Sequence, residues 1–81
     1  MKVRVHFYAQ LRDLTGVYER DVDVAEGSTV RELLESIYTQ TPSLRLHDKS
    51  ILIGSGVEFV DRSHHLKAGD DIAIMPPVQG G

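Results

Sequence analysis

The most reactive feature of the sequence is its ending, Pro76-Pro77-Val78-Gln79-Gly80-Gly81. A glycine carboxylate is the least hindered carbonyl that a protein can offer, and two consecutive glycines can enter a channel too narrow for any Cβ. Such a carboxylate is inert until a partner activates it with ATP, as an acyl-adenylate or an equivalent. The sequence has no phosphate-binding loop for this step. The ending therefore indicates a group that other enzymes modify.

Other residue types with catalytic or metal-binding chemistry are scattered. His64 and His65 are adjacent and point in different directions, and His6 has no acidic or histidine companion at the spacing of metal ligands. Ser55 lacks the strand-turn-helix context of an activated serine. Five carboxylates fall in predicted turns or on alternate strand positions, as is typical of a solvated surface: Asp21, Asp23, Glu26, Asp70 and Asp71. We therefore expect no metal, no bound cofactor and no catalytic centre in the body of the chain.

The composition indicates one small domain in the cytoplasm. Of the 81 residues, 41% are hydrophobic and 26% are charged, which is ordinary for a globular protein. The net charge of −3 and the scattered Lys and Arg argue against a nucleic-acid partner. No apolar run reaches the roughly 20 residues that cross a bilayer, so no membrane partner is expected. The absence of cysteine excludes disulfides and thiolate chemistry.

Alternating hydrophobicity predicts a pair of strands in the first third of the sequence. Residues 2–8 place Val3, Val5 and Phe7 on one face, which leaves Tyr8 on the other. Residues 17–24 resume the alternation, with apolar side chains on one face: Tyr18, Val22 and Val24. Residues 9–16 break the pattern between them. We expect the two strands to pair as a hairpin.

A single helix follows the hairpin. Thr29 and Glu32 have the spacing of a capping box, which predicts that the helix begins there. An apolar stripe with helical spacing follows: Val30, Leu33, Leu34, Ile37 and Tyr38. Pro42 predicts its end after about ten residues.

Short strands occupy the last third of the sequence. We predict strands at residues 51–53, 57–60 and 71–75, with Gly54-Ser55-Gly56 as a turn and an irregular segment before residue 51. In the last strand Ile72 and Ile74 oppose Ala73 and Met75. The elements predict an α+β fold of four to five strands with the helix on one face, which leaves the other face to water or a partner.

Four stretches carry a resemblance to a known family: VRVHFYAQLRDLTG (3–16), EGSTV (26–30), LKAGDD (66–71) and MPPVQGG (75–81). With them the chain resembles, over nearly its full length, the small subunits of molybdopterin synthase, which are ubiquitin-like β-grasp sulfur carriers. The resemblance implies a β-grasp domain with a mixed sheet over residues 1–75 and a flexible tail over residues 76–81.

The family's chemistry implies a role for the tail. Gly81, preceded by Gly80, would be adenylated by a ubiquitin-activating-enzyme-like adenylyltransferase that uses ATP, and then converted to a thiocarboxylate. Its sulfur would enter molybdopterin, the organic part of the molybdenum cofactor, inside the large subunit of the synthase. The chain would be a non-catalytic subunit of a heterotetramer that binds no cofactor itself.

The resemblance also implies where the large subunit binds. Family contacts use apolar residues on the sheet face away from the helix, which correspond to Tyr8, Phe59 and Met75. Tyr8 and Met75 also fall on the outward parity predicted from the alternation. The base of the tail would complete the partner-binding surface: Pro76, Pro77 and Val78.

Three other functions stay open at this point. A sulfur carrier of thiamine synthesis has the same fold, although such chains are typically shorter and lack the double proline. A ubiquitin-like protein modifier would be joined through Gly81 to lysines of its targets. A passive interaction module would have an incidental Gly-Gly ending, and deletion of Gly81 would leave its function intact.

Overall fold

The computed structural model describes residues 1–77, which fold as five strands, two α-helices and one 3-10 helix. The elements follow in the order β1 (Lys2–Phe7), α1 (Gln10–Thr15), β2 (Glu19–Asp23), α2 (Val30–Gln40), η1 (Pro42–Ser50), β3 (Leu52–Ser55), β4 (Glu58–Val60) and β5 (Asp71–Met75). None of the helices in this part of the chain has the length and apolarity to cross a bilayer.

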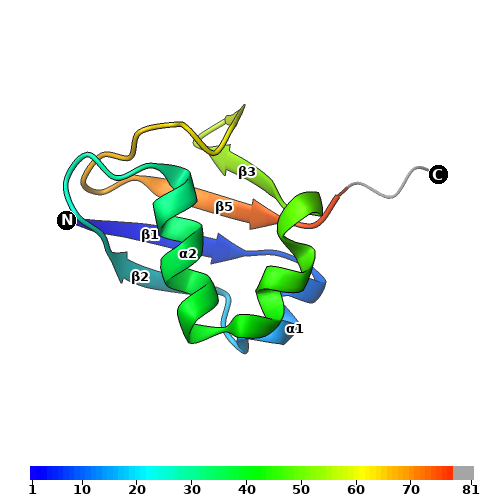
Figure 1. Cartoon of the computed structure of the whole chain (residues 1–81). Coiled ribbons are helices and arrows are strands. Elements are labelled where there is room, and N and C mark those ends of the chain that lie inside the picture. Colours follow the sequence, from blue (N-terminus) through cyan, green and yellow to red (C-terminus); the bar gives the residue numbers. More distant parts are fainter. Residues whose placement is uncertain (78–81) are drawn as a thin grey trace.

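The strands form one mixed sheet in the order β2-β1-β5-β3-β4. β1 and β5 run parallel at its centre, and the three other neighbouring pairs are antiparallel. Figure 1 shows α2 lying across one face of the sheet. Side chains on the opposite face are exposed or half-buried. The predicted fold, a mixed sheet with one main helix on one face, is confirmed.

The hydrophobic core lies between α2 and the sheet. Its members include the inward residues of β1 and β5 and the whole predicted stripe of α2: Val3, Val5, Phe7, Ile72, Ile74, Val30, Leu33, Leu34, Ile37 and Tyr38. Each large apolar side chain buried in this way contributes about 1.5–3 kcal/mol to stability. The predicted capping box is present, because the Thr29 amide donates to Glu32 Oε1 at 3.1 Å and the Glu32 amide donates to Thr29 Oγ1 at 3.5 Å.

Two segments for which the sequence predicted no regular structure are helical. Residues 9–16 contain α1, which ends where Gly16 adopts the left-handed conformation with φ of 78°. The segment after α2 is the 3-10 helix η1, which buries Leu44 in the core. A six-residue helix is too short to show a 3.6-residue period, and a 3-10 helix follows a different period, so hydrophobic spacing does not reveal either element.

Two predicted strand boundaries are also wrong. β2 begins at Glu19, and Tyr18 precedes it with 70% of its surface exposed, so it does not share the buried position of Val22. Gly54 and Ser55, predicted as a turn, belong to β3, and the turn lies at Gly56, where φ is 63°. Pairing with β5 extends β3 through these residues, so the tertiary contact overrides their turn preference.

Candidate functional site

The face of the sheet that α2 does not cover, here called the open face, divides into a charged and an apolar half. Residues paired across the strands share a row on this face, because cross-strand partners point to the same side. One row runs from Glu19 on β2 through His6 and Ala73 to Gly54 and Phe59 on β4. Its β2 and β1 end is polar, whereas its β3 and β4 end is apolar. The order of the strands therefore places polar residues on one half of the open face and apolar residues on the other.

The charged half is a network of ion pairs. Arg4 Nε lies 3.0 Å from Asp21 Oδ1 and 3.5 Å from Glu19 Oε2. The hydrogen bond from Arg4, together with its positive charge, holds the pKa of Asp21 below its ordinary value. His6 Nε2 lies 3.0 Å from Asp71 Oδ1, and His6 Nδ1 lies 3.8 Å from Glu19 Oε2. The expectation that His6 lacks an acidic companion is therefore wrong, because the parallel pairing of β1 and β5 brings Asp71 beside it.

These groups do not assemble a metal centre. Within residues 1–77, no group of three or more His, Asp or Glu side chains is placed to hold a metal ion. His64 and His65 lie in the loop between β4 and β5, and His65 Nδ1 lies 3.2 Å from the Gly27 carbonyl oxygen.

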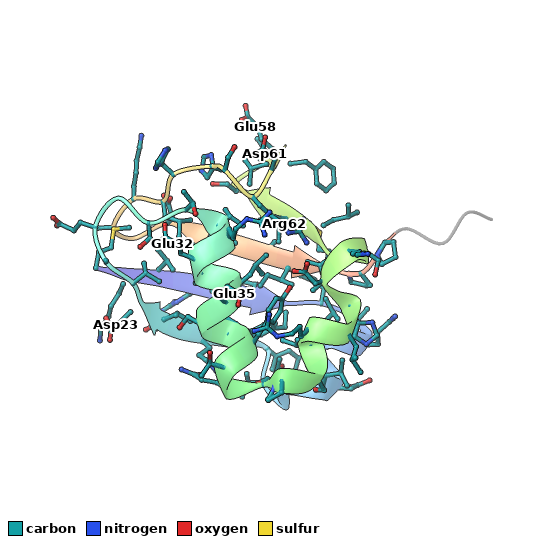
Figure 2. All side chains as sticks on the ribbon, in the orientation of Figure 1. Asp23, Glu32, Glu35, Glu58, Asp61 and Arg62 are labelled. Carbon is teal, nitrogen blue, oxygen red and sulfur yellow. The ribbon has the colours of Figure 1, made fainter. Side chains whose placement is uncertain are left out.

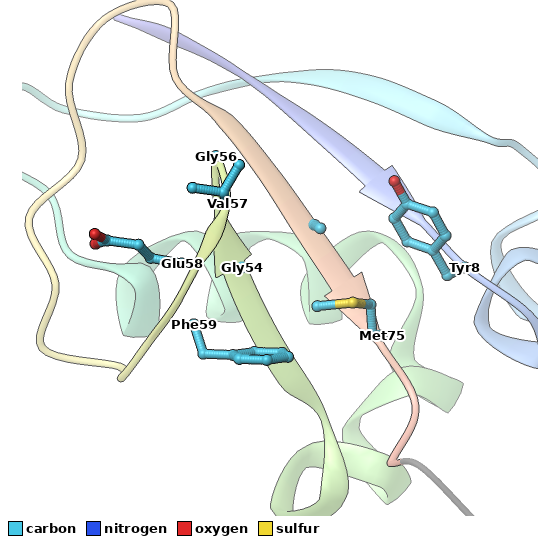
Figure 3. Close-up of a pocket in the computed structure, with 8 residues that line it drawn as sticks. Tyr8, Gly54, Gly56, Val57, Glu58, Phe59 and Met75 are labelled. Carbon is cyan, nitrogen blue, oxygen red and sulfur yellow. The ribbon is translucent and has the colours of Figure 1, made fainter.

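The apolar half of the open face holds a groove of about 320 Å³, here called the sheet groove. Its walls include the three residues predicted to bind a partner: Tyr8, Phe59 and Met75. Phe59 is 72% exposed and Tyr8 is 45% exposed, so two aromatic rings border the groove from the solvent side. Gly54 and Ala73 also line it. Figure 3 shows Gly54 on β3, between the strands that carry Phe59 and Met75.

Backbone pairing explains why these distant residues meet. The Tyr8 amide donates to the Ile74 carbonyl at 3.2 Å, which continues the β1–β5 pairing and places Tyr8 next to Met75. Gly54 pairs with Ala73 on one side and with Phe59 on the other. The structure therefore brings Tyr8, Phe59 and Met75 together on the open face, while their binding role stays a prediction.

The base of the predicted tail lies at the same end of β5. Pro76 is half-buried and Pro77 is exposed, and both line a small hollow of about 200 Å³ with residues of α1 and η1, among them Leu11 and His47. Figure 1 shows that β5 ends on the side of the molecule where α1 lies. Val78, Gly80 and Gly81 lie outside the described residues, so the predicted domain boundary and tail chemistry are not located by the structure.

Sequence reasoning missed the floor of the sheet groove. The sequence pattern predicts a turn at Gly54, and it places Ala73 only on the outward side of the last strand. A Cβ built on Gly54 would lie 3.3 Å from Met75 Cε and 3.6 Å from Ala73 Cβ, so the recess depends on the small size of both residues. The available signal was a pair of small residues on outward strand positions, but their alignment required knowledge of the β3–β5 register.

The chain is similar in sequence and in fold to proteins of known name and structure. It is 35% identical to the Escherichia coli (strain K12) molybdopterin synthase sulfur carrier subunit, over 98% of this chain and 99% of that protein. A solved structure of a putative molybdopterin converting factor, subunit 1, from Pyrococcus furiosus matches with a TM-score of 0.88 and 30% identity, covering 96% of this chain and 99% of that one.

A second solved structure, of SAMP1 from Haloferax volcanii, matches with a TM-score of 0.86 and 27% identity, and the match covers all of both chains. The fold is accordingly the ubiquitin-like β-grasp that the resemblance implied. The sequence pattern of the ThiS family matches residues 5–81, which is nearly the whole chain. This chain is therefore a member of the ThiS family.

Proposed function

We propose that the chain is the sulfur carrier subunit of a molybdopterin synthase and that it carries sulfur as a thiocarboxylate on Gly81. The observation that carries the proposal is the match, over 98% of the chain, to a relative with that function, with the Gly-Gly ending inside the matched family region. The described body of the chain contributes binding surfaces, and the reacting atom belongs to the ending.

The chemistry proceeds in two steps on the terminal carboxylate. A carboxylate oxygen of Gly81 attacks the α-phosphorus of ATP in an adenylyltransferase, pyrophosphate leaves, and an acyl-adenylate forms. A sulfur nucleophile then displaces AMP, which leaves the carbonyl carbon bonded to sulfur. Gly80 and Gly81 offer no side chain that would obstruct either step.

The position of the sheet groove supports delivery of that sulfur into a partner. Six residues, 76–81, follow Met75, and six residues can span at most about 20 Å. A large subunit that docks on the sheet groove would therefore have to place its reaction centre within this distance of Met75. Pro76 and Pro77 restrict the backbone at the start of this span, which lowers the entropy lost when the tail enters a channel.

The similarity to SAMP1, which the solution structure from Methanosarcina acetivorans names in full as small archaeal modifier protein 1, favours a second candidate function. In that case the activated Gly81 carbonyl would be attacked by a lysine amine of a target protein, with formation of an isopeptide bond. Both functions use the same activated carboxylate, so the product of the second step distinguishes them.

The test is the mass of the protein isolated from its own cells, combined with deletion of Gly81. A thiocarboxylate appears as the mass gain of one oxygen replaced by sulfur, and deletion of Gly81 is expected to abolish molybdenum cofactor synthesis. Gln79→Ala is the matched control, because it alters the same segment and keeps both glycines. Undiminished cofactor synthesis after the deletion contradicts the proposal, and conjugates to target lysines without any thiocarboxylate favour the modifier.

A further inference from the structure

The floor of the sheet groove is made of two very small residues. Gly54 and Ala73 are direct cross-strand partners at the centre of the β3–β5 pair. On either side of them lie larger groups, Phe59 next to Gly54 on β4 and Met75 two residues after Ala73 on β5. Figure 3 shows Phe59, Met75 and Tyr8 standing around this floor and Val57 beyond it. The result is a single recess rather than a flat apolar surface.

The recess offers apolar contact. The carboxylate of Glu58 points away from the floor in Figure 3, although this residue lines the groove. The backbone φ of Gly54 lies outside the left-handed region, so glycine is not required there by conformation. A Cβ at this position would instead approach Met75 Cε to 3.3 Å and raise the floor. The small size of Gly54 and Ala73 therefore leaves space for an incoming side chain.

Beside the recess, the charged half of the open face is acidic. It carries four carboxylates, Glu19, Asp21, Asp23 and Asp71, against two permanent cations, Lys2 and Arg4, an excess of two negative charges. In the sheet order β1 and β2 lie on one side of β5, so these four carboxylates border the apolar half from the β2 side. Glu58 lies at the opposite edge from Asp23, as Figure 2 shows. A partner that covers both halves gains by placing basic side chains over β1 and β2.

We propose that the recess over Gly54 and Ala73 receives one large aliphatic or aromatic side chain of the large synthase subunit, with basic side chains of that subunit facing the charged half. This inference rests on the proposed function and adds the chemistry of the contact. Gly54 and Ala73 are then the specificity-determining residues of the interface, because their small size leaves room for the incoming side chain. A second copy of this chain fits less well, because it would bring its own carboxylates to the same acidic face.

The first test fills the recess. Ala73→Leu adds a side chain into open space, and Ala68→Leu is the matched control, because Ala68 is exposed in the turn before β5. Calorimetric titration with the large subunit from the same organism is expected to show binding roughly tenfold weaker or more for Ala73→Leu, and unchanged binding for Ala68→Leu. Phe59→Ala removes an exposed wall and is also expected to weaken binding. Unchanged affinity of both Ala73→Leu and Phe59→Ala would overturn the proposal.

The second test addresses the charges. Glu19→Gln is expected to slow association about twofold at low salt and to flatten its salt dependence, whereas Glu26→Gln, in the loop before α2, is not. An equal effect of both variants would show that only net charge matters and would overturn the placement of the basic groups.

Two further outcomes separate the inference from the function on which it rests. A wild-type chain that does not bind the large subunit at all contradicts the proposed function. Sedimentation equilibrium is expected to show the free chain as a monomer. A wild-type dimer that Ala73→Leu dissociates would instead assign the recess to a second copy and overturn the proposal.

Discussion

Tyr38 is the side chain whose removal should most clearly test how α2 is held to the rest of the body. It is 2% exposed, and its hydroxyl donates to Asp48 Oδ1 of η1 at 2.6 Å. Arg62, in the loop after β4, donates to the Asp48 carbonyl, and its guanidinium lies 3.7 Å from Asp48 Oδ1. Figure 2 shows Arg62 beside α2, so one cluster joins the helix, η1 and this loop.

Tyr38→Phe removes the hydroxyl and keeps the buried ring. A hydrogen bond to a charged group is worth about 1.5–3 kcal/mol. The Asp48 side chain is 37% exposed, so water replaces part of the lost interaction and we expect the lower end, about 1.5 kcal/mol. For a domain of this size that corresponds to a fall in Tm of about 6–12 °C.

The loss of stability in Tyr38→Phe should also depend on pH in a defined direction. Burial, and then the hydrogen bond to Asp48, raise the pKa of Tyr38 above its ordinary value. A raised folded-state pKa stabilises the protein below the unfolded-state value of about 10, and this contribution is lost as pH rises further. The difference in stability between the wild type and Tyr38→Phe should therefore stay constant from about pH 6 to 9 and shrink above about pH 10.

Urea denaturation, followed by circular dichroism at a series of pH values, measures this difference. A cycle with Asp48→Asn supplies the control, because the two substitutions should be strongly non-additive if they act on one hydrogen bond. Equal stability of the wild type and Tyr38→Phe at neutral pH, or a difference that persists unchanged to pH 11 or so, would refute the reasoning.

Three further predictions concern a turn, a helix cap and the groove. Ala9 has φ of 51° and ψ of −134°, which glycine tolerates better, so Ala9→Gly should raise the free energy of unfolding by about 0.5–1 kcal/mol in urea titrations; a loss of stability would count against backbone strain there. Thr29→Ala removes the side-chain acceptor of the capping box and should lower the free energy of unfolding by about 1 kcal/mol in urea titrations. Thr29→Ser keeps an acceptor and should lower it by much less. Met75→Asp should weaken binding of the large subunit by about 2 kcal/mol or more in calorimetry, because a charge would enter the contact; Ala68→Asp is the control, and equal affinities of the two would remove Met75 from the interface.

Short-range patterns were sufficient for the framework of the fold. The alternation of Val3, Val5 and Phe7 predicted β1, and the capping box at Thr29 predicted the start of α2. Both signals depend on interactions within a few residues, so the sequence alone contains them. α1 and η1 were missed because they are short and stabilised by packing, as the burial of Leu11 and Leu44 shows.

The candidate site was only partly predictable. The outward positions of Tyr8 and Met75 followed from strand parity, and Phe59 was added by the resemblance. The contact between His6 and Asp71 joins residues 65 positions apart, and the sequence reasoning gave the opposite expectation for His6. The recess over Gly54 and Ala73 was not predicted, because two small residues form a floor only when the β3–β5 register aligns them, and that register is not a local property.

Local patterns in the sequence are enough to place the alternation of the strands, the start of α2 and the Gly80-Gly81 pair that is predicted to react. Which residues share a row of the sheet depends on contacts between segments that are far apart in the sequence. The parallel β1–β5 pairing placed Tyr8 beside Met75, and the β3–β5 register aligned Gly54 with Ala73. The difference arises because side-chain direction is a local property of a strand with a two-residue period, whereas register depends on the pairing of distant strands and on their burial under α2.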